Sequence, residues 1–182
     1  MARLTLVRHG EASAGWGDDA DPGLSELGRR QADAVAQALA VAGPMPILVS
    51  PLRRTLETAG PLARQWRTEA VVEPRVGEIR TPTGLSDRTT WLRGVMAGRW
   101  SEQDPRLRDW ADDVVDVLLA QTEDTVVVSH FVAINVAVGR ASGDDRVVCV
   151  RPGNCSRTVL DTAGGALRLV EAPVDGGDTD VL

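Results

Sequence analysis

Short apolar runs alternate with longer segments of helical periodicity along the whole chain. The short β-branched or aliphatic runs predict strands over residues 4–7, 46–49, 70–72, 125–128 and 147–150, from residue 158 onward, and over 166–170. Apolar positions at helical spacing predict helices over residues 25–42, 50–66, 87–98, 105–121 and 131–138. This alternation predicts an α/β fold, a three-layer sandwich with a mostly parallel central sheet and helices on both faces.

Capping residues indicate where the first two helices begin. Ser25 is a predicted N-cap, and Gly43 with Pro44 ends that helix. Ser50 and Pro51 are predicted as the N-cap and the first-turn proline of the second helix.

Length and composition predict one ordinary globular domain. The chain has 182 residues, of which 43% are hydrophobic and 25% charged. We expect a single domain over residues 1–174 and a flexible acidic tail over residues 175–182, which are rich in Gly and Asp. A net charge of −6 argues against a nucleic-acid-binding face, although a local Arg cluster can still bind a small anion.

The residues needed for disulfides, metal sites or membrane anchoring are scarce. Cys149 and Cys155 are too few for a disulfide framework, and with only two His in the chain no metal is expected. No signal segment opens the chain, and no run approaches the ~18 apolar residues of a membrane span. We therefore expect a cytoplasmic protein with no membrane partner.

Both histidines directly follow predicted strands. His9 follows residues 4–7 and Arg8, and His130 follows residues 125–128 and Ser129. Because the carboxyl ends of parallel strands share one edge of a sheet, we expect these imidazoles to converge with Arg8 and with Arg54, which follows the second strand. A histidine beside the planar donor fork of an arginine suggests a nucleophile directed at a phosphoryl group. Taken singly, each residue also fits a structural role, such as a capping His or an Arg paired with a nearby carboxylate.

Four motifs in order resemble those of the histidine phosphatase superfamily, which includes the cofactor-dependent phosphoglycerate mutases. They cover roughly residues 4–130 and are Arg8-His9-Gly10-Glu11, Leu24-Ser25-Glu26-Leu27-Gly28 with Gln31-Ala32, Ser50-Pro51-Leu52-Arg53-Arg54-Thr55 with Thr58-Ala59, and Val127-Val128-Ser129-His130. The resemblance implies a phosphoglycerate mutase-like fold.

The resemblance also implies roles for individual residues. His9 would be the nucleophile that takes up the phosphoryl group, and Arg54, not Arg53, would occupy the catalytic position. Arg8, Arg54 and His130 would bind the phosphoryl oxygens, and Glu11 is counted with them as a substrate-binding residue. Glu78 falls where the family places its proton donor.

The carboxylate assignment stays open, because Glu11, Glu69 and Glu73 are alternatives to Glu78. The attacking imidazole must be neutral, and its other N–H needs an acceptor such as a backbone carbonyl. The proton donor must be protonated, a state that burial favours and nearby arginines oppose.

Several positions depart from the family pattern. Ala12 and Gly15 stand where the family often has Thr and Asn, and Phe131 follows the second histidine where Gly is common. Trp16 is a candidate wall of the pocket. The short segment between Glu78 and His130 leaves no room for the large cap of the glycolytic mutases, which favours hydrolysis.

The sequence therefore predicts a histidine acid phosphatase-type phosphomonoesterase. It would hydrolyse small phosphate monoesters through a phosphohistidine on His9, without a metal or other cofactor. The alternatives are a phosphoglycerate mutase and a non-catalytic module that binds phosphorylated ligands. A homodimer is an option that the sequence leaves open, as are the natural substrate and pathway.

Overall fold

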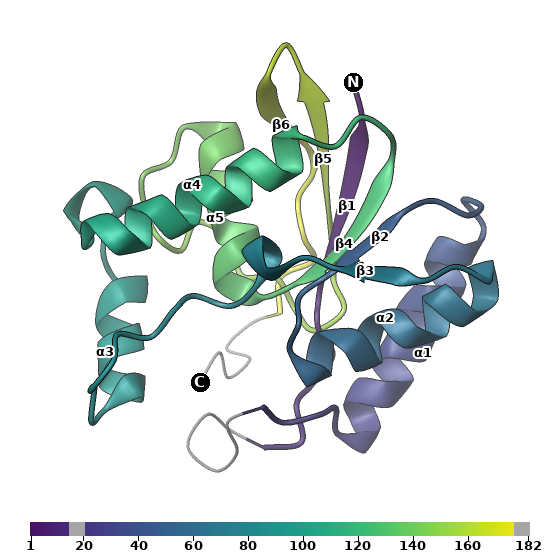
Figure 1. Cartoon of the computed structure of the whole chain (residues 1–182), viewed down its shortest axis with the longest axis horizontal. Coiled ribbons are helices and arrows are strands. Elements are labelled where there is room, and N and C mark those ends of the chain that lie inside the picture. Colours follow the sequence, from purple (N-terminus) through teal and green to yellow (C-terminus); the bar gives the residue numbers. More distant parts are fainter. Residues whose placement is uncertain (15–20, 177–182) are drawn as a thin grey trace.

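A six-stranded sheet forms the centre of the computed structural model, which describes residues 1–14 and 21–176 (Figure 1). The strand order is β3-β2-β4-β1-β5-β6. The first four strands of this order are parallel, and β5 and β6 are antiparallel to their neighbours. The strands are β1 Arg3–Arg8, β2 Ile47–Val49, β3 Ala70–Val72, β4 Thr125–Ser129, β5 Arg157–Ala163 and β6 Ala166–Glu171. The predicted mostly parallel sheet is confirmed.

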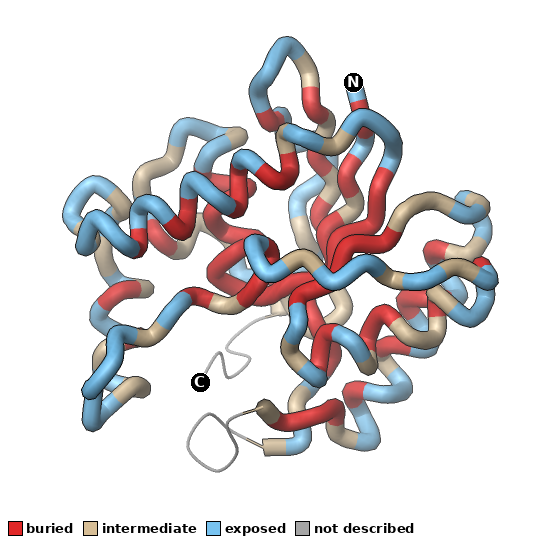
Figure 2. The backbone as a smooth tube through the Cα atoms, viewed as in Figure 1, coloured by how far each residue is buried: buried red, intermediate tan, exposed pale blue. Residues whose placement is uncertain are grey.

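Helices cover both faces of this sheet, as predicted. Within the described residues the helices are α1 Glu26–Ala40, α2 Arg53–Trp66, α3 Arg88–Met96, α4 Pro105–Leu119 and α5 Phe131–Ser142. Two short 3-10 turns, η1 Pro74–Val76 and η2 Trp100–Glu102, lie in the connections. In β4, Val126 and Val128 face the core under α1 and α2, while Val127 faces the core that α4 and α5 close. The alternation of the strand side chains thus builds two cores, visible as the buried segments in the middle of Figure 2.

The parallel strands end level with one another at one edge of the sheet. Arg8 at the end of β1 pairs with Ser129 at the end of β4, and Val49 at the end of β2 pairs with Val128. The next residue of each strand remains hydrogen-bonded: the His9 N–H donates to Ser129 O at 3.0 Å, and the Ser50 N–H to Val128 O at 3.1 Å. This edge therefore brings three motifs side by side.

Residues 147–150 do not form the predicted strand. The Oδ1 atom of the buried Asn135 accepts the N–H groups of Cys149 at 2.8 Å and Val150 at 2.9 Å, and the Val147 N–H donates to Gly98 O. Because a helix side chain and a loop carbonyl take these donors, the segment joins no ladder of the sheet.

The predicted N-cap role of Ser50 is also wrong. Helix α2 begins at Arg53 with Leu52 as its N-cap, and no side chain caps it there. The Ser50 hydroxyl instead lies 2.7 Å from Nε2 of His130. The prediction for Ser25 is confirmed, since its hydroxyl accepts the Gly28 N–H at 2.9 Å.

The predicted tail begins with ordered contacts. Asp175 forms a bridge with Pro152, and the Gly176 N–H donates to Arg151 O at 2.9 Å. Residues 177–182, like Gly15 and Trp16, lie outside the described residues. The domain boundary and the tail therefore stay predictions.

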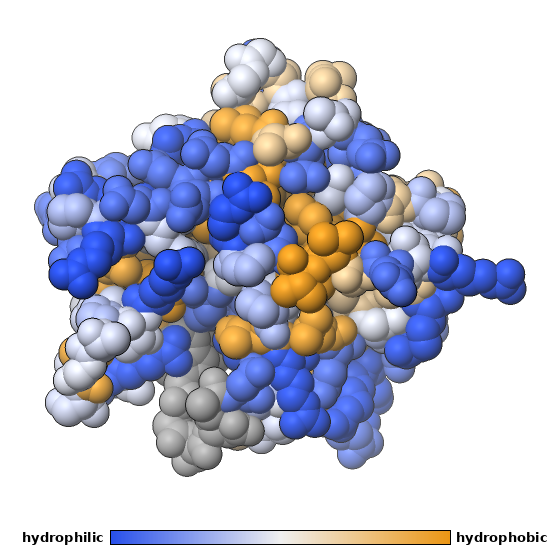
Figure 3. All heavy atoms as spheres, in the orientation of Figure 1, coloured by the Kyte–Doolittle hydropathy of each residue, from blue (hydrophilic) through white to orange (hydrophobic). Residues whose placement is uncertain are grey.

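The edge strand β3 carries an apolar patch. Val71 and Val72 are exposed, and Figure 3 shows hydrophobic atoms gathered over this strand. None of the described helices is both long and apolar enough to cross a membrane.

Candidate active site

The two histidines converge at the edge where the parallel strands end. Their ring centroids lie 5.2 Å apart, with 61° between the ring planes. His9 is 8% exposed and His130 is fully buried. Two imidazoles that are far apart in the sequence thus share one site, as predicted.

Arg54 connects these two rings. It lies in the first turn of α2, where its Nε donates to Nε2 of His9 at 3.2 Å and its Nη2 lies 3.3 Å from Nδ1 of His130. Arginine has only donors, so Nε2 of His9 is the unprotonated nitrogen of that ring. The other nitrogen, Nδ1, carries the proton and donates a hydrogen bond to Gly10 O at 2.8 Å. The lone pair of His9 Nε2 therefore points toward Arg54.

Both imidazoles are neutral near pH 7. Burial, followed by the positive charge of Arg54, lowers the pKa of His9 to about 3. Burial, followed by interactions with His9 and Arg54, also lowers the pKa of His130 well below its ordinary value. A neutral imidazole beside arginine donors is suited to attack an electrophile that carries negative charge.

Glu78 lies against both Arg54 and His130. Its Oε2 is 3.6 Å from Arg54 Nη2 and 3.5 Å from His130 Nδ1, while its Oε1 accepts the Ile79 N–H at 2.9 Å. Burial raises the pKa of this carboxyl, although the Ile79 N–H and Arg54 act in the opposite direction. Glu78 is thus held in a setting that favours a protonated acid.

Arg8 lies at the same edge and contacts a different segment. Its Nη1 donates to Pro152 O at 2.8 Å, and its guanidinium carbon is 5.3 Å from the centre of the Phe131 ring. Burial lowers the pKa of Arg8 to about 10, so the side chain stays cationic near pH 7. Phe131 therefore brings an aromatic surface to the site by packing on Arg8.

Arg53 and Arg54 have different environments. Arg53 is exposed, and its Nε bonds to Glu57 at 2.8 Å. Its backbone N–H donates to Asp21 Oδ1, and this oxygen is 4.0 Å from Nη1 of Arg54. Only Arg54 joins the histidines, as the family resemblance implies.

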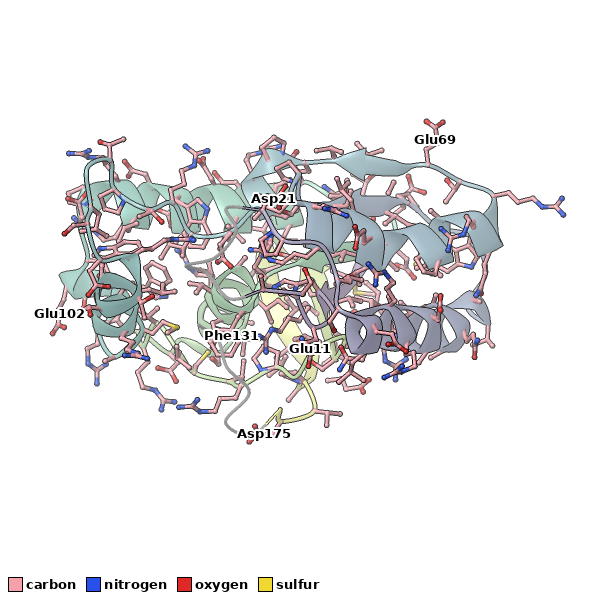
Figure 4. The ribbon with its side chains drawn as sticks, turned by 90° about the horizontal axis from the view of Figure 1, so that it is seen from below. Glu11, Asp21, Glu69, Glu102, Phe131 and Asp175 are labelled. Atoms are coloured by element: carbon pink, nitrogen blue, oxygen red, sulfur yellow. The ribbon has the colours of Figure 1, made fainter. Side chains whose placement is uncertain are left out.

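The alternative carboxylates have other partners or positions. The Glu11 carboxylate accepts the Ser25 hydroxyl at 2.6 Å, and that of Glu73 bonds to Arg75 at 2.7 Å. Figure 4 looks onto this edge of the sheet and shows Glu69 well away from Glu11 and Phe131. Glu11 thus bonds to the start of α1, whereas Glu78 contacts Arg54 and His130.

Thr58 and two glycines position the loop after β1. The Thr58 hydroxyl accepts the Gly10 N–H at 3.0 Å and donates to Arg54 O at 2.7 Å, which ties the loop to α2. A Cβ on Gly10 would lie 2.6 Å from Gly28 O, and one on Gly28 would overlap Glu11 O. Gly10 does not adopt positive φ, and the contact that requires glycine there is its close packing against Gly28 at the start of α1. Thr58 and Gly28 each lie in one of the four motifs, and these motifs are the sequence signal for their roles.

Two further residues act on Glu78. Ser129 lies in the last of the four motifs, whereas Arg88 lies in none of them. The Ser129 hydroxyl donates to Val76 O at 2.6 Å and so attaches the loop that contains Glu78 to β4. The positive charge of Arg88, at the start of α3, acts to lower the pKa of Glu78. Burial lowers the pKa of Arg88 itself, and the charge of Glu78 opposes this shift. The environment of Glu78 is thus set from three segments of the chain.

Known proteins share this sequence pattern and fold. The model of the histidine phosphatase superfamily (branch 1) matches residues 4–174. A protein named probable phosphoglycerate mutase GpmB, from Proteus mirabilis, is 35% identical over 96% of this chain and 98% of its own length. A bifunctional protein of Mycobacterium tuberculosis is 34% identical over 61% of this chain, and the match spans only 30% of that protein.

A solved structure of related architecture supports the fold. Phosphoserine phosphatase from Entamoeba histolytica, in complex with 3-phosphoglyceric acid, superposes with a TM-score of 0.75 at 22% identity. The match covers 100% of this chain and 99% of that one. Because the family model spans nearly all of the described domain, the chain belongs to the histidine phosphatase superfamily, in its branch 1.

Proposed function

We propose that this protein is a metal-independent phosphatase that hydrolyses small phosphate monoesters through a phosphohistidine on His9. The observation that supports it most is the unprotonated Nε2 of His9, which lies 3.2 Å from Arg54 Nε. A lone pair among buried cations suits an attack on phosphorus, since phosphoryl transfer depends mainly on positioning and charge stabilisation.

In the first step, His9 Nε2 attacks the phosphorus of the ester. An N–P bond forms while the bond from phosphorus to the ester oxygen breaks. Arg54, Arg8 and His130 bind the phosphoryl oxygens and stabilise their charge. Protonated Glu78 gives its proton to the leaving oxygen, so that a neutral alcohol departs and Glu78 becomes a carboxylate.

In the second step, a water molecule attacks the phosphorus of phosphohistidine. Glu78 takes a proton from this water, the N–P bond breaks, and its electron pair returns to His9 Nε2. Inorganic phosphate is released, and both His9 and Glu78 regain their starting protonation states. Neither step needs a metal to supply charge, because two guanidinium groups are already at the site.

The nearest alternative is phosphoryl transfer of the phosphoglycerate mutase type, which the name of the Proteus relative favours. A mutase must keep the phosphoryl group away from water and return it to its substrate. Between Glu78 and His130 this chain has only α3, η2, α4 and β4, and α4 and β4 build the domain core. We therefore prefer hydrolysis to the mutase, and also to a binding module, which needs no nucleophile. The cytoplasmic location, the absence of a cofactor and a homodimer stay predictions.

A panel of phosphate esters assayed in EDTA tests this function. We expect release of inorganic phosphate by the wild type and a loss of at least about 10³-fold in the His9→Ala variant. Reactions with an ester labelled in its phosphoryl group should be quenched in alkaline detergent, because the N–P bond of phosphohistidine hydrolyses in acid. They should show label on the wild-type protein and none on the variant. Hydrolysis at the wild-type rate by His9→Ala would exclude the mechanism. Isomerised product that depends on 2,3-bisphosphoglycerate would favour the mutase, and binding of phosphate esters without turnover would favour the module.

A further inference from the structure

Ser50 contacts one of the two histidines from a fully buried position directly after β2. Its Oγ lies 2.7 Å from Nε2 of His130, and its own backbone N–H is bonded to Val128 O. The Leu52 N–H points at the same hydroxyl oxygen, at 3.4 Å. Backbone hydrogen bonds of Ser50 and Leu52 thus hold the hydroxyl in place beside His130.

The surroundings of His130 decide which nitrogen carries its proton. Its Nδ1 lies 3.3 Å from Arg54 Nη2, and an arginine nitrogen can only donate. This contact favours a neutral ring with its proton on Nε2, where Ser50 Oγ lies within hydrogen-bond distance. The guanidinium of Arg54 between the two rings then favours opposite tautomers for His9 and His130.

We propose that Ser50 is a positioning residue, whose hydroxyl accepts the Nε2–H of His130 and keeps Nδ1 directed at the place of the phosphoryl group. This inference rests on the proposed function, because it gives His130 the task of binding a phosphoryl oxygen. Ser50 acts on the bound phosphoryl group through His130, the site residue that its hydroxyl contacts.

The same contact prepares His130 to accept a second proton. A phosphate monoester that arrives as a monoanion carries one ionisable O–H, whose pKa is about 6. As the ester binds, that O–H bond breaks and an N–H bond forms at Nδ1, which gives a dianion beside an imidazolium. Burial, His9, Arg54 and Arg8 oppose a positive ring, whereas the negative charge of the bound ester favours it. Ser50 accepts Nε2–H in both states, and this bond is stronger when the ring is charged.

Phosphate affinity tests the role of the hydroxyl. Replacing Ser50 by Ala leaves a buried N–H without its acceptor, so we expect inorganic phosphate to inhibit the Ser50→Ala variant about 10- to 100-fold more weakly. Ser50→Thr keeps the hydroxyl and should restore most of the affinity. The control is Thr162→Val, which removes a buried hydroxyl that bonds to Ala2 near the other end of β1. Unchanged inhibition in Ser50→Ala would contradict the proposal.

Nitrogen NMR gives a readout that loss of stability would not imitate. The chain has only two histidines, so ¹⁵N-labelled imidazoles give few signals. We expect the wild type to show His130 as the Nε2–H tautomer, and as imidazolium after phosphate is added. In Ser50→Ala the imidazolium should form less readily. A free wild type with the proton on Nδ1 of His130 would overturn the inference, even if a variant does not fold. Failure to trap phosphate on His9, with these NMR signals present, would contradict only the proposed function.

Discussion

The Nε atom of Arg54 donates to Nε2 of His9 across 3.2 Å, although 45 positions separate the two residues in the chain. This bond leaves the imidazole with its lone pair directed at a cation, and Gly10 O fixes the opposite nitrogen. When a phosphoryl group binds, one of its oxygens would replace His9 Nε2 as the hydrogen-bond acceptor of Arg54.

Arg54 should be essential, and its neighbour Arg53 dispensable. We expect Arg54→Ala to lower kcat/KM by about 10²–10³-fold, because a preorganised donor to the transition state is lost. Arg54→Lys should remain impaired, since an ammonium lacks the planar fork. Arg53→Ala is the matched control in the same helical turn; it loses an exposed ion pair with Glu57 worth about 0.2–1 kcal/mol and should keep its activity. Equal losses in both variants would contradict the site.

Glu78→Gln should distinguish esters by their leaving groups. Gln cannot give a proton, so we expect turnover of alkyl phosphates to fall by about 10²–10⁴-fold, while aryl phosphates with acidic phenols lose far less. Because burial raises the pKa of Glu78, the wild type should lose activity toward alkyl phosphates as the pH rises through that raised value. The variant should lack this alkaline limb. Steady-state rates measured against pH with both ester classes would reveal this alkaline limb. An equal loss of turnover on both classes in Glu78→Gln would argue against Glu78 as the proton donor.

Acid should weaken the fold through the two histidines. In the folded state the pKa of His9 is about 3, whereas an unfolded histidine titrates near its ordinary value. Below about pH 6.5 the unfolded state therefore binds protons that the folded state does not, and each such histidine costs up to about 1.4 kcal/mol per pH unit. Urea unfolding at about pH 7 and about pH 5 should show a smaller pH dependence for His9→Gln than for the wild type. Parallel pH profiles would show that His9 is not held neutral.

Two helical glycines provide a test of close packing. Gly28→Ala would push a Cβ into Glu11 O, so we expect a loss of stability and a displaced loop after β1, with weaker phosphate binding. Gly94 in α3 has no heavy atom within 4 Å of its Cβ direction. Gly94→Ala should therefore stabilise the protein by up to about 1 kcal/mol through helix propensity. Thermal unfolding should give a lower Tm for Gly28→Ala and a higher Tm for Gly94→Ala. The same change of Tm in both variants would contradict the packing role of Gly28.

Some of the site could be predicted from the sequence because its signals are local. Residues 4–7 and 125–128 are short apolar runs that form largely buried strands, and a histidine stands two positions after each run. Parallel pairing then requires His9 and His130 to share an edge. The motif that contains Arg54 places this arginine after the second strand, at the same edge. These positions follow from short segments of sequence, and the structure confirms that the three side chains meet.

Local pattern failed where distant partners take the hydrogen bonds. Residues 147–150 are apolar enough for a strand, but Asn135 takes two of their N–H groups. Ser50 has the composition of a helix cap, but its hydroxyl is committed to His130. In both cases a partner remote in sequence competes with the local structure and wins.

The amino-acid sequence alone determined the α/β layers, the ends of the strands and the position of the two histidines at those ends. These features depend on hydrophobic periodicity and turn residues, which act over a few positions. The three-dimensional packing decided that Glu78, and not Glu11, Glu69 or Glu73, meets Arg54 and His130. It also decided the direction of every pKa shift described at the site. The physical reason is that protonation depends on the charges and donors within a few ångströms, and here these come from segments that only the folded chain brings together.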